Sequence, residues 1–177
     1  MNEYPILFNT EMVRAILAGK KTQTRRVMKP QPDETKARWT GERWEFHMGY
    51  PIGHDVPKCP YGKPGDKLWV RETWCPNYYS DGRVGYKADW RNPLPEVVAE
   101  TKWKPSIFMP KSAARIWLEI VDVRVERVRS ITSTDAIAEG INIDTENFHE
   151  LWNSINAKRG FGWDVNPWVW VVEFSKT

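Results

Sequence analysis

The sequence predicts an α+β fold in which strands curl into one sheet, with two or three helices at its rim. Apolar residues alternate along residues 66–74 and 113–128, as in strands with one buried face. They recur at helical spacing after Thr10 and again after Thr145. The alternation also changes phase between Ile120 and Val121, which predicts a bulge in a long bent strand of the kind found in small, curled barrels.

The N-terminal residues are expected to form a strand, a helix and a second extended segment. Residues 5–8 are a short apolar run, typical of a buried strand. Thr10 is a suitable N-cap for the helix that follows, and Gly19 is a natural stop at its C-terminus. Residues 22–27 alternate and are expected to be extended until the sequence K-P-Q-P at 29–32 breaks them.

The middle of the chain carries one clear strand, residues 66–74, between two stretches with turn signals. Residues 38–46 are typical of a hairpin with a turn near Thr40 and Gly41, and residues 49–65 are rich in Pro and Gly, which favours a loop. Residues 75–110 show little helical periodicity. We expect them to be an insertion with a small hairpin around residues 84–90.

The C-terminal part is expected to contain two helices and a final strand. Residues 132–139 begin with the capping signature T-S-T-D. The helix after Thr145 carries a clean apolar stripe, made of Phe148, Leu151, Trp152 and Ile155. Residues 160–166 are expected to be a loop, and residues 167–174 a buried strand.

Length and composition exclude several classes of protein. A chain of 177 residues can bury a core as one domain, and 41% hydrophobic residues argue against global disorder. No apolar run approaches the roughly 20 residues of a membrane span, and the N-terminus lacks the features of a signal peptide. Two cysteines, Cys59 and Cys75, suit a reducing compartment. We therefore expect a cytoplasmic protein without membrane contact.

The charge distribution is uneven although the net charge is only +3. Residues 14–43 hold nine Lys or Arg against three Asp or Glu, whereas residues 131–177 hold three against seven. One interpretation is a basic face that attracts anions. The other is a pair of solvated patches that neutralise each other, and composition does not decide between them.

The eleven tryptophans also have two interpretations. Filling the core is the default because Trp carries a large apolar area. Stacking on nucleic-acid bases is the alternative. The best stacking candidates lie in polar, turn-rich stretches: Trp39, Trp44, Trp74, Trp90 and Trp103.

The first candidate for chemistry is the cationic segment that follows Gly19. Lys21 and Thr24 lie three residues apart, among the cations Lys20, Arg25 and Arg26. Neighbouring positive charges disfavour the charged form of Lys21, and a neutral lysine can serve as a base for a hydroxyl nucleophile. On spacing alone, a solvated loop is the competing interpretation.

Two glutamates and a set of soft ligands complete the candidates. Glu139 ends a short helix, where the helix dipole disfavours an anion, and Glu72 is in phase with the core residues of its strand. Glu72 either lies in water at the strand end or points into a cleft near the cationic segment. No metal or cofactor is expected, because no phosphate-binding glycine motif occurs and no metal-binding spacing links His47, His54, Cys59 and Cys75.

Four motifs together resemble the ASCH domains of the PUA-like superfamily. They are A-I-L-A-G-K-K-T-Q-T-R-R, P-G-D-K-L-W-V-R-E, A-I-A-E-G-I followed by F-H-E-L-W, and P-W-V-W-V-V-E-F. The resemblance implies a single domain over residues 1–177, with insertions at about 38–61 and 75–112. The longer layout, including K-W-K-P-S-I-F-M-P-K, resembles ASCH proteins of bacteriophages and prophages.

The resemblance also implies a fold and a chemistry. ASCH domains have a PUA-like β-barrel with a cleft rimmed by helices, which commonly binds RNA or modified nucleosides. One small bacterial branch hydrolyses the amide of N4-acetylcytidine with a Lys, a Thr and a Glu. Lys21 and Thr24 match the first two, and Glu139 is the best match to the third.

In the implied mechanism Lys21 deprotonates Thr24, and Glu139 holds or protonates the leaving amine. Arg26 would stabilise the oxyanion, and Arg25, Glu72 and Trp74 would help to bind the substrate, a modified nucleoside or small amide. Glu72 would also orient Lys21. The alternatives are an RNA-binding PUA-like module, with or without ribonuclease activity, and a phage accessory protein that acts through protein contacts.

Overall fold

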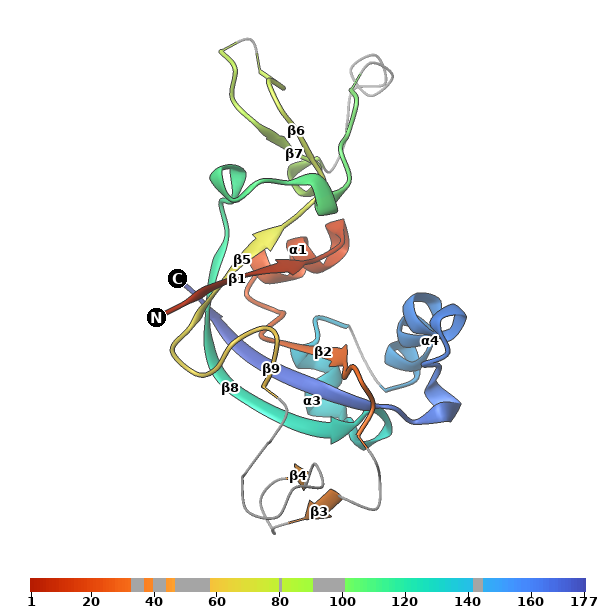
Figure 1. Cartoon of the computed structure of the whole chain (residues 1–177). Helices are drawn as coiled ribbons and strands as arrows, with labels where there is room; N and C mark the ends of the chain where they lie inside the picture. The colour runs from red at the N-terminus through yellow and green to blue at the C-terminus, as the bar shows by residue number, and fades with distance from the viewer. Residues whose placement is uncertain (33–36, 40–43, 47–57, 80, 91–100, 142–144) are drawn as a thin grey trace.

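The computed structural model describes residues 1–32, 37–39, 44–46, 58–79, 81–90, 101–141 and 145–177. Its centre is a five-stranded sheet (Figure 1). The strands, in their order across the sheet, are β1 (Glu3–Leu7), β5 (Lys67–Arg71), β8 (Trp117–Arg127), β9 (Trp168–Lys176) and β2 (Gln23–Val27). β1 runs parallel to β5, and the other neighbours are antiparallel. With three α-helices beside this sheet, the α+β prediction is confirmed.

The helices lie where the apolar periodicity predicts them. They are α1 (Thr10–Leu17), α3 (Ser133–Ala138) and α4 (Thr145–Asn156). The predicted cap of α1 was wrong by one residue, because the Asn9 side chain accepts the hydrogen bond from the Met12 N–H, at 2.8 Å. Gly19, with φ of +69°, follows α1 in the left-handed conformation that glycine adopts without strain.

The expected barrel is not closed among the described strands. β1 and β2 are the two ends of the sheet order and do not pair with each other. α1 connects them, and its buried residues Val13 and Ile16 belong to the same core as Ile6 and Met28, which precede and follow it. We attribute the open sheet to this helix, which packs in the space that direct pairing of the two strands would occupy.

The bend predicted in the long strand is present. The pairing of β8 with β9 shifts register between Ile120 and Asp122, so Val121 is the extra residue and is 57% exposed. Beyond the shift both strands continue in a long curve (Figure 1). A bulge increases the local twist and bends the strand that carries it, which explains this shape.

β9 is buried on both faces, as its uninterrupted apolar run predicts. Trp168, Trp170, Val172 and Phe174 pack in the core shared with α1. Val169 and Val171 point the other way and pack beneath α3 and α4. The sheet therefore separates two cores, and α4 is held on the side opposite to α1.

The two stretches with turn signals contain short hairpins. β3 (Ala37–Trp39) pairs with β4 (Trp44–Phe46), while the turn near Thr40 and Gly41 and most of the 49–65 loop lie outside the described residues. β7 (Gly85–Tyr86) pairs with β6 (Trp74–Cys75). A hairpin was expected around residues 84–90, and one of its strands, β7, lies there; the partner strand β6 lies at the start of the insertion.

Short 3₁₀ helices complete the fold: η2 (Lys87–Asp89), η3 (Ser106–Phe108), η4 (Lys111–Ala113), η5 (Val128–Ser130), η6 (Ala157–Arg159) and η7 (Trp163–Val165). The last of these lies in the loop expected at 160–166. Within the described residues, no helix combines the length and the apolar character that a membrane crossing requires.

Candidate active site

A cavity of about 390 Å³ lies beside β2, a size typical of small-molecule sites. One wall is apolar and comes from the α4 stripe predicted from sequence: Phe148, Leu151, Trp152 and Ile155. The β1–α1 region contributes Leu7 and Met12. The polar wall is β2 itself, through residues 24–27, together with Glu139. The cavity therefore offers one apolar face and one face rich in hydrogen-bonding groups.

Alternation along β2 sends its side chains to both sides of the sheet. Thr24, Arg25 and Arg26 follow one another in this strand, and successive side chains of a strand point to opposite faces. Arg25 therefore points toward α3, whereas Thr24 and Arg26 point toward α1 and the Phe8 ring. The Arg26 guanidinium lies 5.1 Å from the centre of that ring. Because β2 is an edge strand, residues from both faces reach the same cavity.

The open edge of β2 also presents backbone groups. The Thr22 carbonyl accepts a hydrogen bond from β9, and the Met28 N–H donates one to the Trp168 carbonyl, so even-numbered residues pair with β9. In an antiparallel pair the intervening residues point the other way. The N–H and C=O groups of Arg25 and Val27 consequently face the open edge, and both residues line the cavity. No described residue bonds to these groups, so a ligand can reach them.

Lys21 is the most deeply buried charge of the site. Its Nζ donates three hydrogen bonds: to the Glu139 carboxylate at 2.7 Å, to the Glu139 carbonyl at 2.8 Å and to the Gln23 carbonyl at 2.8 Å. Backbone pairing between Lys21 and Glu139, supported by the Thr22 N–H to Ala138 carbonyl bond, joins this segment to the end of α3. The ammonium is thus fully hydrogen-bonded, which is the condition for burying a charge.

Opposing effects act on the pKa of Lys21. Burial lowers it, the Glu139 carboxylate raises it, and the positive charges of Arg26 and Arg25 lower it further. The net direction is downward from the ordinary value. A lowered pKa makes the neutral amine more accessible than in an exposed lysine, as a lysine base requires.

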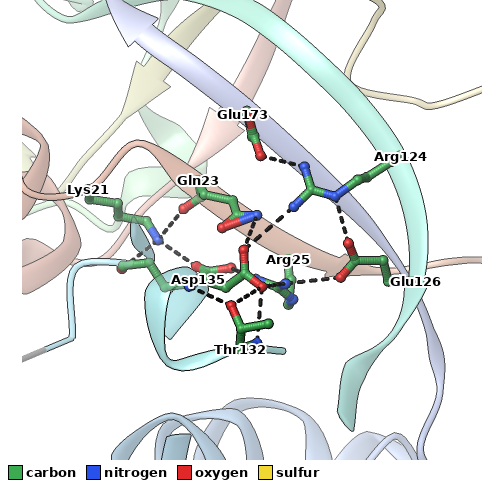
Figure 2. Close-up of polar contacts among 9 residues, drawn as sticks. Lys21, Gln23, Arg25, Arg124, Glu126, Thr132, Asp135 and Glu173 are labelled. Atoms are coloured by element: carbon green, nitrogen blue, oxygen red, sulfur yellow. Dashed lines mark hydrogen bonds and ion pairs between the residues drawn. The ribbon is translucent and has the colours of Figure 1, made fainter. Parts of the chain in front are cut away.

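Arg25 connects the Lys21–Glu139 pair to a larger ionic network (Figure 2). Its guanidinium lies 3.5 Å from Glu139, 3.0 Å from Glu126 and 3.2 Å from Asp135. Arg124 shares the last two carboxylates, at 2.6 Å and 3.6 Å. These bonds fix the Arg25 side chain, which is fully buried, and leave its Nε without a partner among the described residues.

Asp135 belongs to this network and also caps α3. Its carboxylate accepts hydrogen bonds from the Thr132 N–H and hydroxyl, while the Thr132 hydroxyl accepts one from the Asp135 N–H. This is the capping box that the sequence predicts. The Gln23 amide also donates to Asp135, at 3.2 Å. The start of α3 is therefore tied to β2, and its end delivers Glu139 to Lys21.

Thr24 is 3% exposed and lines the cavity. Its hydroxyl makes no hydrogen bond to a described residue, and all three Lys21 bonds go elsewhere. Arg26 donates to the Leu7 carbonyl at 2.7 Å and keeps its Nε free of described partners. The structure therefore brings Thr24, Arg25, Arg26 and Glu139 together around one cavity. Lys21 does not line this cavity and is linked to it through Glu139.

Glu72 and Trp74 lie elsewhere and do not line this cavity. The Glu72 carboxylate is bonded at both oxygens to Arg115, at 2.9 and 3.0 Å, and burial raises its pKa although Arg115 opposes this. Glu72 is thus neither solvated nor near Lys21, and orienting Lys21 falls to Glu139. Trp74 packs against Met109 and Ala113.

The other tryptophans proposed for base stacking are also engaged. Trp90 and Trp103 pack with Tyr78, at ring-centre distances between 5.4 and 5.7 Å. The side chains of Trp39 and Trp44, like His47 and His54, lie outside the described residues. In the described part of the chain no group of three or more His, Cys, Asp or Glu residues is arranged to hold a metal ion.

Several site residues were missed from sequence. Gln23, Glu126 and Asp135 support the charged groups, and Tyr61, Lys29 and Arg159 line the cavity. The capping signature did mark Asp135, but only as a helix cap. Gln23 and Glu126 carry no local signal, because their partners lie 112 and 101 residues away along the chain.

No family model and no curated protein sequence matches the chain. Two solved structures are similar to it. An ASCH domain from Lactobacillus crispatus JV V101 is 13% identical with a TM-score of 0.46, covering 99% of this chain and 79% of that one. A DUF984 protein from Enterococcus faecalis V583 is 9% identical with a TM-score of 0.48, covering 100% and 80%. Both similarities are weak, so we base the function on the geometry of the site.

Proposed function

We propose that the protein hydrolyses the amide of an acylated nucleoside such as N4-acetylcytidine. The observation that carries this proposal is the buried Lys21–Glu139 pair, 2.7 Å apart, beside a cavity that Thr24 and Glu139 both line. These are the three residues to which the ASCH-like motifs assign catalysis. A cavity of about 390 Å³ with an apolar wall suits a nucleoside.

In the proposed first step Lys21 passes one ammonium proton to Glu139. The neutral amine then accepts the hydroxyl proton of Thr24 while the Thr24 Oγ forms a bond to the acetyl carbon. Lys21 does not contact Thr24 in the ligand-free site, where its three bonds go to Gln23 and Glu139. Substrate must therefore draw the two side chains together, as commonly occurs when catalytic hydrogen bonds tighten in a complex.

The tetrahedral intermediate then collapses with cleavage of the bond between the acetyl carbon and N4. Glu139 gives its proton to N4, so that cytidine leaves as a neutral amine and the Lys21–Glu139 ion pair is restored. Water next attacks the acetyl–Thr24 ester, one water proton returns to the Thr24 Oγ, and acetic acid leaves and ionises. The hydroxyl proton that Thr24 loses in the first half-reaction is replaced by a water proton in the second.

The arginines and the strand edge have supporting roles in this proposal. Arg26 lines the cavity, and the charge of its guanidinium is suited to stabilising the oxyanion. Arg25, whose charge is balanced by carboxylates, also lines the cavity and leaves that part of the wall polar without a net charge. The open backbone groups of Arg25 and Val27 form a donor–acceptor pair suited to the edge of a pyrimidine.

The test is release of cytidine from N4-acetylcytidine by the wild type and by Lys21→Ala. We expect the substitution to lower kcat/KM by at least about 100-fold, the usual contribution of a positioned base. Lys20→Ala is the matched control, because Lys20 is exposed and should be dispensable. Circular dichroism of all three proteins excludes unfolding as the cause. Full activity in folded Lys21→Ala would refute the assigned role.

A second candidate, binding of single-stranded RNA without hydrolysis, is favoured by the cations that line the cavity. Arg26, Lys29 and Arg159 all lie there. Binding through several phosphates weakens steeply with salt, whereas turnover of an uncharged nucleoside barely responds. The tryptophan stacking that would hold RNA bases is less well supported, because Trp74 is buried and Trp90 and Trp103 pack on Tyr78.

A further inference from the structure

We infer that the cavity binds a phosphate group at the side formed by Lys29 and Arg159, so that its ligand is a nucleotide rather than a free nucleoside. This inference rests on the proposed nucleoside-binding function and extends it to the substrate class. It concerns two residues to which the sequence motifs give no role.

Among the described residues, positive charge around the cavity exceeds negative charge. The described lining contains four cationic side chains and one carboxylate. The carboxylate, Glu139, is neutralised by Lys21, and Arg25 is neutralised by Glu126 and Asp135. Three cations remain, and none of them forms an ion pair with a described residue: Arg26, Lys29 and Arg159.

These three cations are also held close together. The Lys29 ammonium lies 5.4 Å from the centre of the Phe161 ring, two residues beyond Arg159. Arg159 is bonded to Asn156, at 3.4 Å, where α4 ends. The pKa of Arg26 is lowered mainly by burial; Tyr61 and the Glu139 carboxylate oppose this, and the charge of Arg159 lowers the pKa further, so the two guanidinium groups lie within electrostatic reach. Cations that outnumber the carboxylates around them create a positive potential that an anion relieves.

The lining of the cavity combines buried and solvent-exposed groups. The reacting groups Thr24 and Glu139 lie on its polar wall, and the α4 stripe forms its apolar wall. Lys29 and Arg159 are both exposed to solvent and follow the ends of β2 and α4 respectively. A nucleotide combines the matching groups, an uncharged base and a hydrated, doubly charged phosphate. A Lys and an Arg are the residues that commonly bind such a group.

A structural role for Arg159 is the competing explanation. Cations near the C-terminus of a helix interact favourably with its dipole, and Arg159 follows the end of α4. In that case removing Arg159 would lower stability but leave the affinity for phosphate unchanged. The neighbouring Lys158 is also exposed and lies near the same helix end, but it does not line the cavity. Replacing Lys158 therefore distinguishes a role in helix stability from a role in phosphate binding.

The test compares the dissociation constants of cytidine and cytidine 5′-monophosphate by titration calorimetry at low salt. We expect the phosphate to tighten wild-type binding by about tenfold, because two partly exposed cations contribute a few-fold each. Lys29→Gln and Arg159→Gln should each weaken binding of the monophosphate by about 2–5-fold. Neither substitution should change the dissociation constant of cytidine. Lys158→Gln should change the dissociation constant of neither ligand.

Equal affinity for cytidine and its monophosphate would overturn the inference, as would equal losses in Lys158→Gln and Arg159→Gln. Tricytidylate, which carries phosphodiesters, identifies the source of the phosphate: tighter binding than the monophosphate assigns it to an RNA chain, and weaker binding to a free nucleotide. Both results retain the phosphate site.

Binding is measured without turnover, so the inference and the proposed function can fail separately. If N4-acetylcytidine is hydrolysed but the phosphate adds no affinity, the inference alone is wrong. If the phosphate adds affinity through Lys29 and Arg159 but no amide is hydrolysed, the proposed function alone is wrong.

Discussion

Lys21 occupies a place where an isolated ammonium could not be buried. Its side chain is 0% exposed, and it is tolerated because Glu139 lies 2.7 Å away and two carbonyls take its other protons. Lys21 and Thr24 could be predicted as site residues because one short motif carries both. The carboxylate that pairs with Lys21 was not predicted: the resemblance implied Glu139 only as a partner of the leaving amine, and Glu72 was expected to orient Lys21. Since 118 residues separate Lys21 from Glu139, no local pattern links them.

Gly140 gives a sharp test of how tightly Lys21 is held. A Cβ at Gly140 would lie 2.9 Å from the Ala15 Cβ and 3.0 Å from the Lys21 Cβ, at a φ of +84°. Gly160 has nearly the same φ, +82°, and a Cβ there would have nothing within 4 Å. We expect Gly140→Ala to lower the unfolding free energy by about 1–3 kcal/mol more than Gly160→Ala does. Urea denaturation of both variants measures the difference, and equal losses would mean that Lys21 can move aside freely.

At the scale of elements, periodicity was a good guide to local structure. The stripe on α4, the capping box of α3 and the bulge in β8 all depend on residues close in sequence, and all three predictions are confirmed. The strand that pairs with β7 was not predicted, because strand pairing depends on contacts that the local pattern does not encode. The same reason explains why Glu72 was placed in water or near Lys21, when Arg115 binds it from 43 residues away.

The capping box of α3 should make stability depend on pH through Asp135. Burial raises the pKa of Asp135, but the hydrogen bonds from Thr132 and the charges of Arg25 and Arg124 outweigh it, so the net pKa lies below the usual 3.8. A carboxyl group with a lowered folded-state pKa contributes stability above pH 3.8 and loses it as the pH falls through the folded value.

We therefore expect Asp135→Asn to be less stable than the wild type by about 1 kcal/mol at pH 7, the usual scale of a cap. The difference should shrink as the pH falls below 3.8 toward the lower pKa that Asp135 has in the folded protein, because protonation then removes the charge that asparagine lacks. Urea denaturation between about pH 3 and pH 7 follows it. Glu150→Gln, at an exposed carboxylate of α4, is the control. A difference that stays constant over this range would contradict the ionic role.

At the scale of the whole molecule, the open sheet is a feature that the sequence did not predict, and we relate it to α1. Among the described strands the sheet is open where a barrel was expected, and we attribute this to α1, which connects β1 and β2 and shares its core with residues on either side. The open edge of β2 is what allows the cavity to form beside Thr24 and Arg25. The topology of the sheet therefore sets the position of the site, although no local motif indicates it.

The insertion lies at the opposite end of the sheet from α4 (Figure 1). None of its described residues lines the cavity, and Trp103 packs on Tyr78 and Trp90 instead. We expect Trp103→Ala to lower stability by about 2 kcal/mol through lost aromatic packing, without changing the KM for N4-acetylcytidine. Urea denaturation and steady-state kinetics measure the two effects. A large change in KM with an intact fold would show that the insertion reaches the substrate.

Release of cytidine from N4-acetylcytidine by the wild type and by Thr24→Val tests the central claim most directly. Valine has nearly the shape of threonine, so it preserves packing at this buried position and removes only the hydroxyl. We predict turnover by the wild type and a loss of at least about 100-fold in Thr24→Val. Equal turnover by the two proteins, or none by the wild type, would contradict the assignment of Thr24 as the nucleophile of an amidohydrolase.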